Sequence, residues 1–145
     1  MIALLQRVTS ASVSVEEQSI ARIESGLLVY VAIQPADDNG SLSRMSERIL
    51  AYRMFADGEG RMNRNVVQVE SEILLVPQFT LAADTRKGLR PNFSQAASPE
   101  HAAVLFNGLA DKLKSKYAKV QTGEFGARMQ VHSVNDGPVT FWLQL

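Results

Sequence analysis

Thr80 is the side chain in this sequence best suited to attack a carbonyl group. It follows the proline-interrupted strand at Pro77, and Gln78 lies two residues before it, so both side chains share one strand face. A threonine hydroxyl attacks an ester only when a neighbouring base takes its proton, and no base lies nearby in the sequence. Threonine is also common in strands because its branched side chain fits a pleated sheet. The segment therefore predicts either a reactive hydroxyl or ordinary strand packing.

Residues 135–138, Asn-Asp-Gly-Pro, lie between two strand-like segments. These residue types are typical of a hairpin turn. A Gly-Pro bond also adopts the cis form at a cost of about 0.5 to 1 kcal/mol, which turns backbone carbonyls in a direction that a trans bond does not allow. A site that distinguishes mirror-image ligands can use such fixed carbonyls in place of side chains. Both interpretations remain open from the sequence.

Arg86, Lys87 and Arg90 form a dense group of positive charges on a loop that Gly88 and Pro91 shape. Positive side chains of this kind bind the phosphate groups of nucleic acids. A solvated surface loop explains the same residues equally well. The loop is therefore a candidate phosphate contact, with the solvated loop as the alternative.

The sequence does not predict metal or cofactor chemistry. It contains no cysteine, which excludes disulfides, thiolate metal sites and a cysteine nucleophile. His101 and His132 are the only histidines, and neither has carboxylates at ligand spacing. The chain also lacks a Gly-x-Ser-x-Gly elbow, a glycine-rich phosphate loop and a His-Glu-x-x-His motif. We expect no metal and no cofactor.

Length and composition predict one domain spanning residues 1–145, because 145 residues that are 46% hydrophobic suffice for one sizeable core. The 15 basic and 15 acidic residues balance, so a nucleic acid must bind through a local patch. No apolar run reaches membrane length, and the N-terminus carries no cleavage-site pattern. These features predict a cytoplasmic protein with no membrane partner.

Strands and two helices must position the residues described above. Alternating apolar residues predict strands, which we place at residues 2–8, 11–15, 20–23, 27–33, 73–81, 120–122, 129–134 and 139–145. Apolar residues three and four apart predict a helix over residues 41–55. Ser98 and Pro99 predict the start of a second helix. Its apolar stripe consists of Ala102, Leu105, Phe106, Leu109, Leu113 and Tyr117.

The arrangement of these elements predicts an α+β fold. Many short strands and two main helices occur without a regular strand-helix alternation. We expect a strongly curved, barrel-like sheet that is mostly antiparallel or mixed. In the last strand, alternation predicts that Val139 and Leu143 face the core while Thr140 and Trp142 face away from it.

Three motifs, in this order and spacing, resemble those of the D-aminoacyl-tRNA deacylase family. They are Pro77-Gln78-Phe79-Thr80-Leu81, Lys87-Gly88-Leu89-Arg90-Pro91-Asn92-Phe93 and Asn135-Asp136-Gly137-Pro138-Val139-Thr140. The similarity runs from Met1-Ile2-Ala3 and Gln6-Arg7-Val8 to Phe141-Trp142-Leu143, which is essentially the whole chain. The resemblance implies a homodimer that hydrolyses the ester between a D-amino acid and the 3′ end of tRNA, with glycyl-tRNA as a further substrate.

The resemblance also implies roles for particular residues. Gln78, Phe79 and Thr80 line the pocket for the amino acid and the terminal adenosine. Gly137 and Pro138 form a cis pair that enters the partner subunit's pocket, at the subunit interface, and excludes L-amino acids. Further residues support these two groups: Arg7 and Met129 match positions that hold the arrangement in place, and Ala102 matches a position near the substrate amine. Arg86, Lys87 and Arg90, selected above by their charge alone, are the candidate tRNA contacts.

An aminoacyl ester is already reactive and carries a neighbouring ribose hydroxyl. In this family the RNA is therefore thought to assist, while protein amides orient the carbonyl and stabilise its developing charge. We expect Thr80 to position the substrate first and to act as a nucleophile only second. Pro77 departs from the family pattern, which has serine there, and proline offers neither a hydroxyl nor a backbone N–H. Phe79 follows the family pattern and favours ordinary D-selectivity.

Two other classes of function fit the same residues. A non-catalytic tRNA-binding module would keep the fold and bind without turnover. A D-amino-acid esterase without an RNA partner would hydrolyse simple esters and ignore tRNA. The balanced charge favours the second alternative, whereas the three motifs favour the deacylase, and none of these hypotheses requires DNA.

Overall fold

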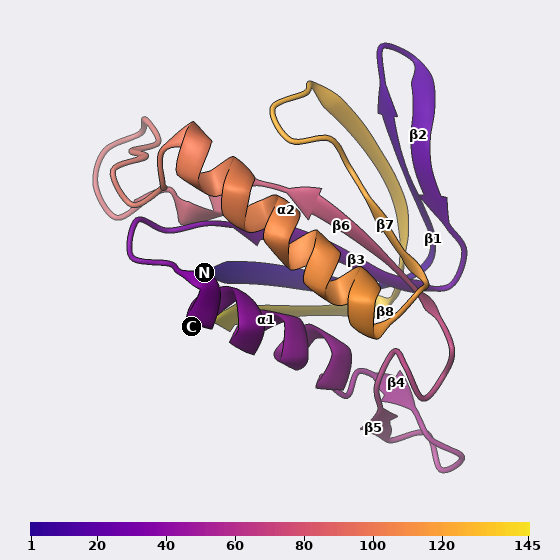
Figure 1. Ribbon diagram of the computed structural model, residues 1–145. Helices are drawn as coiled ribbons and strands as arrows, with labels where there is room; N and C mark the ends of the chain where they lie inside the picture. The colour runs from indigo at the N-terminus through magenta and orange to yellow at the C-terminus, as the bar shows by residue number, and fades with distance from the viewer.

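The structure, a computed structural model, describes residues 1–145 and contains a curved mixed sheet with two helices on one of its faces (Figure 1). The sheet strands are β1 (Ile2–Val15), β2 (Gln18–Ile23), β3 (Gly26–Ala32), β6 (Glu72–Pro77), β7 (Val120–Thr122) and β8 (Met129–Gln144). The helices are α1 (Asn39–Ala51) and α2 (Pro99–Lys116), and a short 3-10 helix, η1, spans Phe79–Ala82. Two short strands, β4 (Phe55–Ala56) and β5 (Met62–Arg64), form a separate hairpin. The predicted α+β fold with a barrel-like sheet is confirmed.

The long strand β1 organises the sheet. Its first half pairs with β3 and its second half with β2, while β8 pairs along almost its whole length. Beyond β3 the sheet continues through two parallel pairings, β3 with β6 and β6 with β7. The sequence predicted two strands, at residues 2–8 and 11–15, where the structure has one. Thr9 and Ser10 interrupt the apolar alternation but stay in the strand: Ser10 pairs with Val134 of β8, and Thr9 lies at one of two register shifts in this pairing.

The first helix begins and ends earlier than the predicted range of 41–55. Asp38 precedes it, and its carboxylate accepts a hydrogen bond from the N–H of Ser41 at 2.8 Å, which satisfies a free amide at the helix start. Tyr52 has extended dihedral angles and ends the helix after Ala51. Phe55 is buried, as its apolar character predicts, but it belongs to β4 rather than to a helix.

The second helix begins as predicted. Ser98 accepts a hydrogen bond from the N–H of His101 at 3.3 Å, and Pro99 occupies the first helical position. Five of the six stripe residues are buried in the main core, and Tyr117 packs against it half-buried. Both helices cover the same sheet face, where α2 crosses the strands and α1 lies beside it (Figure 1). Neither helix is long and apolar enough to cross a membrane.

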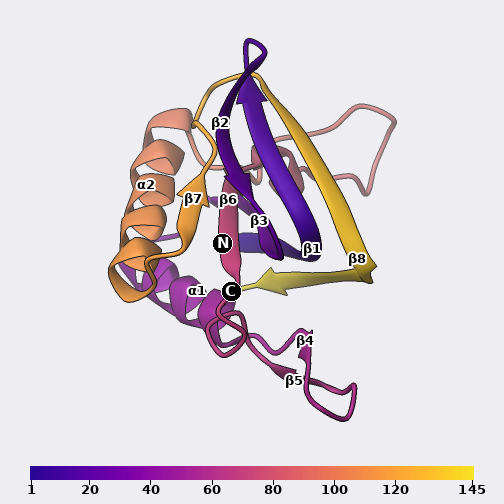
Figure 2. The ribbon, with the colours of Figure 1, turned by 90° about the vertical axis from the view of Figure 1, so that its right-hand side faces the viewer.

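The predicted hairpin turn at residues 135–138 is wrong. Both halves of β8 pair with β1, and they do not pair with each other. Thr140 lies opposite Gln6 and Asn135 lies opposite Val8, so residues 136–139 of β8 face only Arg7 of β1. These four residues therefore leave the ladder as a bend within one strand, and β8 turns a sharp corner in Figure 2.

Candidate active site

A hollow of about 450 Å³, which we call the β6 hollow, lies beside the end of β6. Eight of its twelve lining residues are hydrophobic. The lining comes from four parts of the chain: Val76 to Phe79 at the end of β6, Ala97 with Pro99 and Ala102 at the start of α2, the segment from Phe125 to Ala127, and Met129 with Val131 on β8. An apolar cavity with few polar groups is typical of a small-ligand site.

The segment Gln78–Thr80 leaves β6 at the edge of this hollow. Pro77 lies opposite Val31 of β3, and the N–H of Gln78 still donates to the carbonyl of Val31 at 2.7 Å. The chain then tightens into η1, so the predicted strand over residues 73–81 ends earlier than expected. Parallel pairing with β3 therefore fixes the point from which the three-residue segment starts.

Gln78 and Thr80 form a short polar contact at this point. The Gln78 side chain donates from Nε2 to Thr80 Oγ1 at 2.5 Å. No side chain accepts the proton of the Thr80 hydroxyl, and no His, Asp, Glu or Lys shares a hydrogen bond with it. The Thr80 oxygen is thus held by a donor rather than activated by a base.

The backbone N–H groups of Phe79 and Thr80 make no hydrogen bond within the chain. Helix starts leave such amides unpaired, and here Gln78, the residue before η1, provides no side-chain cap. Both residues are exposed; Phe79 lines the β6 hollow, and Thr80 follows it at the edge of a second hollow described below. Two neighbouring N–H donors can hold a carbonyl oxygen or the negative charge that develops on it.

Phe79 is unusually exposed for a large aromatic residue, with 56% of its surface accessible. Its ring packs against Phe93 from the following loop, with ring centroids 5.0 Å apart. This contact links the two motifs that begin at Pro77 and Lys87. Ala102 is buried at the first turn of α2, and Met129 is half-buried at the start of β8.

Sequence reasoning missed Phe125, which also lines the β6 hollow. Its ring packs at a centroid distance of 6.1 Å from Phe106 of α2, and this contact anchors the loop between β7 and β8. The signal in the sequence was a single aromatic residue in a mostly polar stretch, which does not by itself distinguish a site from a core contact.

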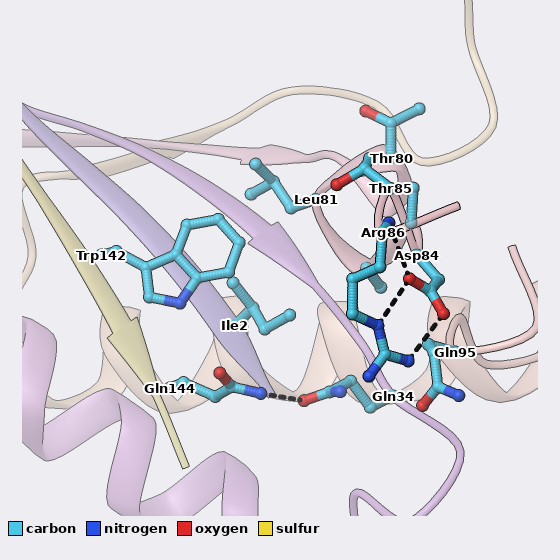
Figure 3. A pocket seen from close by; sticks show the side chains of 12 residues that line it. Ile2, Gln34, Thr80, Leu81, Asp84, Thr85, Arg86, Gln95, Trp142 and Gln144 are labelled. Carbon is cyan, nitrogen blue, oxygen red and sulfur yellow. Dashed lines mark hydrogen bonds and ion pairs between the residues drawn. The ribbon is translucent and has the colours of Figure 1, made fainter. Parts of the chain in front are cut away.

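A second hollow, of about 650 Å³, lies beside η1 and is lined by Thr80, Arg86, Trp142 and several glutamines (Figure 3). We call it the Trp142 hollow. Trp142 lines it from β8, and Gln144 donates to Gln34 at 3.4 Å along its floor. Thr80 lines this hollow, whereas Gln78 and Phe79 line the β6 hollow. Only five of its twelve lining residues are hydrophobic, so we regard the more apolar β6 hollow as the better ligand site.

Arg86 of the candidate phosphate loop already has an anionic partner. Its Nε and Nη2 atoms donate to the two carboxylate oxygens of Asp84 at 2.9 and 2.7 Å, as Figure 3 shows. These hydrogen bonds lower the pKa of the Asp84 carboxyl to about 2, and the same pair raises the pKa of Arg86. Lys87 and Arg90 are exposed and make no ion pair. The loop therefore carries less free positive charge than its sequence indicates.

The bend in β8 holds Gly137 and Pro138, and the peptide bond between them is cis. Gly137 has φ 125°, a conformation that favours glycine. A Cβ atom there would lie 2.7 Å from Val139 Cγ2 and 3.2 Å from Arg7 Nη2. The chain can thus approach Arg7 this closely only with glycine at position 137.

Arg7 supports the bend from β1. Its Nη1 donates to the carbonyl of Met54 at 3.0 Å, and its Nε lies 3.0 Å from Asp136 Oδ2. The Nε–H is nevertheless without a well-directed hydrogen bond, so we describe the contact with Asp136 as an ion pair and not as a hydrogen bond. Through these two contacts Arg7 connects the bend to the segment after α1.

The structure therefore divides the predicted site residues into groups. Gln78, Phe79, Ala102 and Met129 meet at the β6 hollow. Arg7 lies against the bend that contains Gly137 and Pro138, and neither these two residues nor Arg7 line either hollow of the same chain. Thr80 and Arg86 line the Trp142 hollow, and no cluster of three or more His, Cys, Asp or Glu side chains is positioned to hold a metal.

Comparisons with known proteins point to one protein family. The model of the D-Tyr-tRNA(Tyr) deacylase family matches residues 4–144. A protein named D-aminoacyl-tRNA deacylase from Escherichia coli O1:K1 is 51% identical over 145 residues, covering all of both chains. The protein of the same name from Shigella boydii serotype 18 has the same identity and coverage.

Two solved structures share the arrangement of strands and helices. The c-Myc DNA Unwinding Element Binding Protein superposes with a TM-score of 0.96 at 39% identity, covering 100% of this chain and 99% of that one. A probable eukaryotic D-amino acid tRNA deacylase superposes with a TM-score of 0.88, covering 98% and 97%, and its 17% identity supports the fold alone. These likenesses define an α+β class with a curved mixed sheet. The chain belongs to the D-Tyr-tRNA(Tyr) deacylase family, which confirms the resemblance of its three motifs.

Proposed function

We propose that this protein hydrolyses the ester bond between a D-amino acid and the 3′ end of tRNA, which frees the tRNA for correct charging. One observation carries the proposal: Gln78, Phe79, Ala102 and Met129 come from separate elements and meet at one apolar hollow. Family membership over residues 4–144 and 51% identity to a D-aminoacyl-tRNA deacylase support the same activity.

In the proposed reaction, water adds to the ester carbonyl carbon. The bond from this carbon to the ribose oxygen then breaks, and the ribose oxygen takes a proton. The unpaired N–H groups of Phe79 and Thr80 hold the carbonyl oxygen as negative charge develops on it. One such donor typically contributes about 3 to 4 kcal/mol to stabilising the transition state.

Thr80 acts as a positioning residue in this scheme. Its oxygen accepts a hydrogen bond from Gln78 and has no base to take its proton. The neighbouring ribose hydroxyl of the substrate assists in proton transfer instead. The reaction needs no metal and no cofactor.

The protein works as a homodimer whose active sites lie at the subunit interface. The Gly137–Pro138 bend of one subunit closes the β6 hollow of the other, and its backbone carbonyls exclude L-amino acids. Arg7 and Met129 keep these two parts in place. The apolar side chains left exposed near the two hollows, Phe79 and Trp142 at 56% and 49% accessible, support burial by a second copy.

The remaining assignments belong to the same proposal. Residues 1–145 act as one cytoplasmic domain, with glycyl-tRNA as a second substrate. Lys87 and Arg90 contact tRNA phosphates, and Arg86 does so only by exchanging its pairing with Asp84. Neither DNA nor a membrane takes part.

The test is the deacylation rate of D-tyrosyl-tRNA, L-tyrosyl-tRNA and glycyl-tRNA by the purified protein, with spontaneous hydrolysis as the baseline. We expect rapid loss of the D-ester and the glycyl ester beside an intact L-ester. A D-tyrosyl-tRNA with a 2′-deoxy terminal adenosine should react slowly. Binding without turnover would identify the tRNA-binding module, and efficient hydrolysis of simple D-amino-acid esters would identify the esterase without an RNA partner.

A further inference from the structure

The bend at residues 136–139 has no β-ladder to hold it. These residues face only Arg7 of β1, and the regular pairing resumes at Asn135 on one side and at Thr140 on the other. Asp136, Gly137 and Pro138 are exposed, so packing does not fix them either. Val139 is buried and Asp136 pairs with Arg7, so directed hydrogen bonds must supply the remaining restraints on this segment.

Asn135 supplies two of these bonds from a single side chain. Its Oδ1 accepts the N–H of Val139 at 3.1 Å, and its Nδ2 donates to Thr140 Oγ1 at 3.0 Å. Asn135, the residue before the bend, is thus tied to Val139 at the end of the bend and to Thr140, which follows it. An asparagine amide can do this because it has an acceptor and a donor on one rigid plane.

Thr140 connects this arrangement to the neighbouring strand. Its Oγ1 also accepts a hydrogen bond from Gln6 Nε2 at 3.4 Å, and Gln6 is the β1 residue paired with Thr140. The hydroxyl therefore lies between the bend and the sheet. We call Asn135 and Thr140 together the bend clamp.

We infer that the bend clamp consists of positioning residues that set how strictly the protein separates D- from L-esters. The inference rests on the proposed function, in which the carbonyls of Gly137 and Pro138 form the chiral filter. Neither clamp side chain lines a hollow, so both act through the bend and not on the substrate. A filter for mirror-image ligands requires groups held to within about 0.5 Å, which an untethered exposed bend does not provide.

Four variants test the clamp. Thr140→Val keeps the shape and strand preference of the side chain but removes its hydrogen-bonding oxygen, whereas Thr140→Ser keeps the oxygen. Asn135→Leu removes both bonds of the asparagine. Ser133→Ala removes an exposed hydroxyl from the same strand outside the clamp and is the matched control.

We expect the ratio of D-ester to L-ester deacylation rates to fall about tenfold in Asn135→Leu, which loses two hydrogen bonds, and severalfold in Thr140→Val. In Thr140→Ser the ratio should stay close to that of the unaltered protein, and in Ser133→Ala it should not change. A general loss of stability would lower both rates together and leave the ratio unchanged, so the ratio separates positioning from folding.

Hydrogen exchange of the Val139 amide provides a readout that needs no turnover. It should be about tenfold faster in Asn135→Leu than in the unaltered protein and Ser133→Ala, because its acceptor is lost. If the unaltered protein hydrolyses no ester, the proposed function fails, and the selectivity role fails with it. If it separates D- from L-esters and the ratio is unchanged in both Asn135→Leu and Thr140→Val, only the role of the clamp is overturned.

Discussion

The side-chain amide of Gln78 donates a hydrogen bond to the hydroxyl oxygen of Thr80 at 2.5 Å. A nucleophilic threonine requires the opposite arrangement, with an acceptor for its proton. The contact therefore makes the hydroxyl a fixed polar group at the edge of the site. It gives a direct way to distinguish positioning from covalent catalysis.

We predict that Thr80→Val lowers the single-turnover rate of D-tyrosyl-tRNA deacylation by about tenfold. This is the effect expected from losing one or two hydrogen bonds. Thr80→Ser should stay within about threefold of the unaltered rate, because the oxygen remains. Covalent catalysis would instead make Thr80→Val inactive, by a factor on the order of 10⁴ or more. It would also leave an acyl-enzyme that mass spectrometry detects.

Ala102 lets us test whether the β6 hollow holds the substrate. It is 7% exposed and lines the hollow at the first turn of α2. Ala102→Leu should fill part of the hollow and raise KM for the D-ester by about tenfold or more, at a stability cost of about 1 to 3 kcal/mol.

Val104→Leu is the control for Ala102→Leu, because Val104 lies on the same helix with 70% of its surface exposed. It should change neither KM nor the melting temperature. An unchanged KM in a folded Ala102→Leu protein would move the substrate away from the β6 hollow.

Gly137→Ala should disturb the bend without unfolding the protein. The new Cβ would lie 2.7 Å from Val139 Cγ2, at φ 125°, where side chains are strained. We expect deacylation of the D-ester to fall by about tenfold or more, since such strain costs on the order of 1 to 3 kcal/mol and the bend must shift.

Gly58→Ala is the matched control for the glycine test. A Cβ at Gly58 meets nothing within 4 Å, and its φ is not in the positive region. Circular dichroism should show that the unaltered protein, Gly137→Ala and Gly58→Ala are all folded. Unchanged rates on both the D-ester and the L-ester in Gly137→Ala would remove the bend from the chiral filter.

The pairing of Asp84 with Arg86 predicts how the loop responds to acid. The folded pKa of Asp84 is about 2, below its ordinary value, because Arg86 hydrogen-bonds the charged carboxylate. Its contribution to stability is therefore fully present above the unfolded pKa of about 4 and is lost as the pH falls towards 2. Carbon NMR of the Asp84 carboxyl should show this low midpoint.

Arg86→Gln should return the Asp84 midpoint towards its ordinary value, because both hydrogen bonds and the charge are lost. Lys87→Gln is the control, since Lys87 forms no ion pair with Asp84. A midpoint near 4 in the unaltered protein would mean that the pair does not persist in solution, and that Arg86 is free to bind phosphate.

The parts of the fold that were predicted correctly have strong local signals. Ser98 and Pro99 mark the start of α2 through their own side chains, and the stripe from Ala102 onward has helical spacing. Asn135 to Pro138 carry the residues of a hairpin turn as well as those of a bend. Only the long-range pairing of both halves of β8 with β1 decides between them, and no local pattern contains that information.

The candidate site shows the same limit. Thr80 and Gln78 were singled out by residue type and spacing, whereas Phe79, Ala102 and Met129 entered through the family resemblance alone. Phe125 was missed because a lone aromatic residue in a loop has no periodicity. The pairing of Asp84 with Arg86 was not predicted, because side chains two residues apart pair only in particular loop conformations, which no local sequence pattern specifies.

The pairing of Ile2 with Gln144 joins residues from opposite ends of the sequence. Contacts of such long sequence separation form late and slowly, and domains dominated by them fold on the order of milliseconds to seconds. β1 therefore lacks one of its three partners until β8 arrives. On a ribosome, a chain still missing β8 would present β1 as an open edge, and the geometry needed for selectivity would be the last part of the molecule to form.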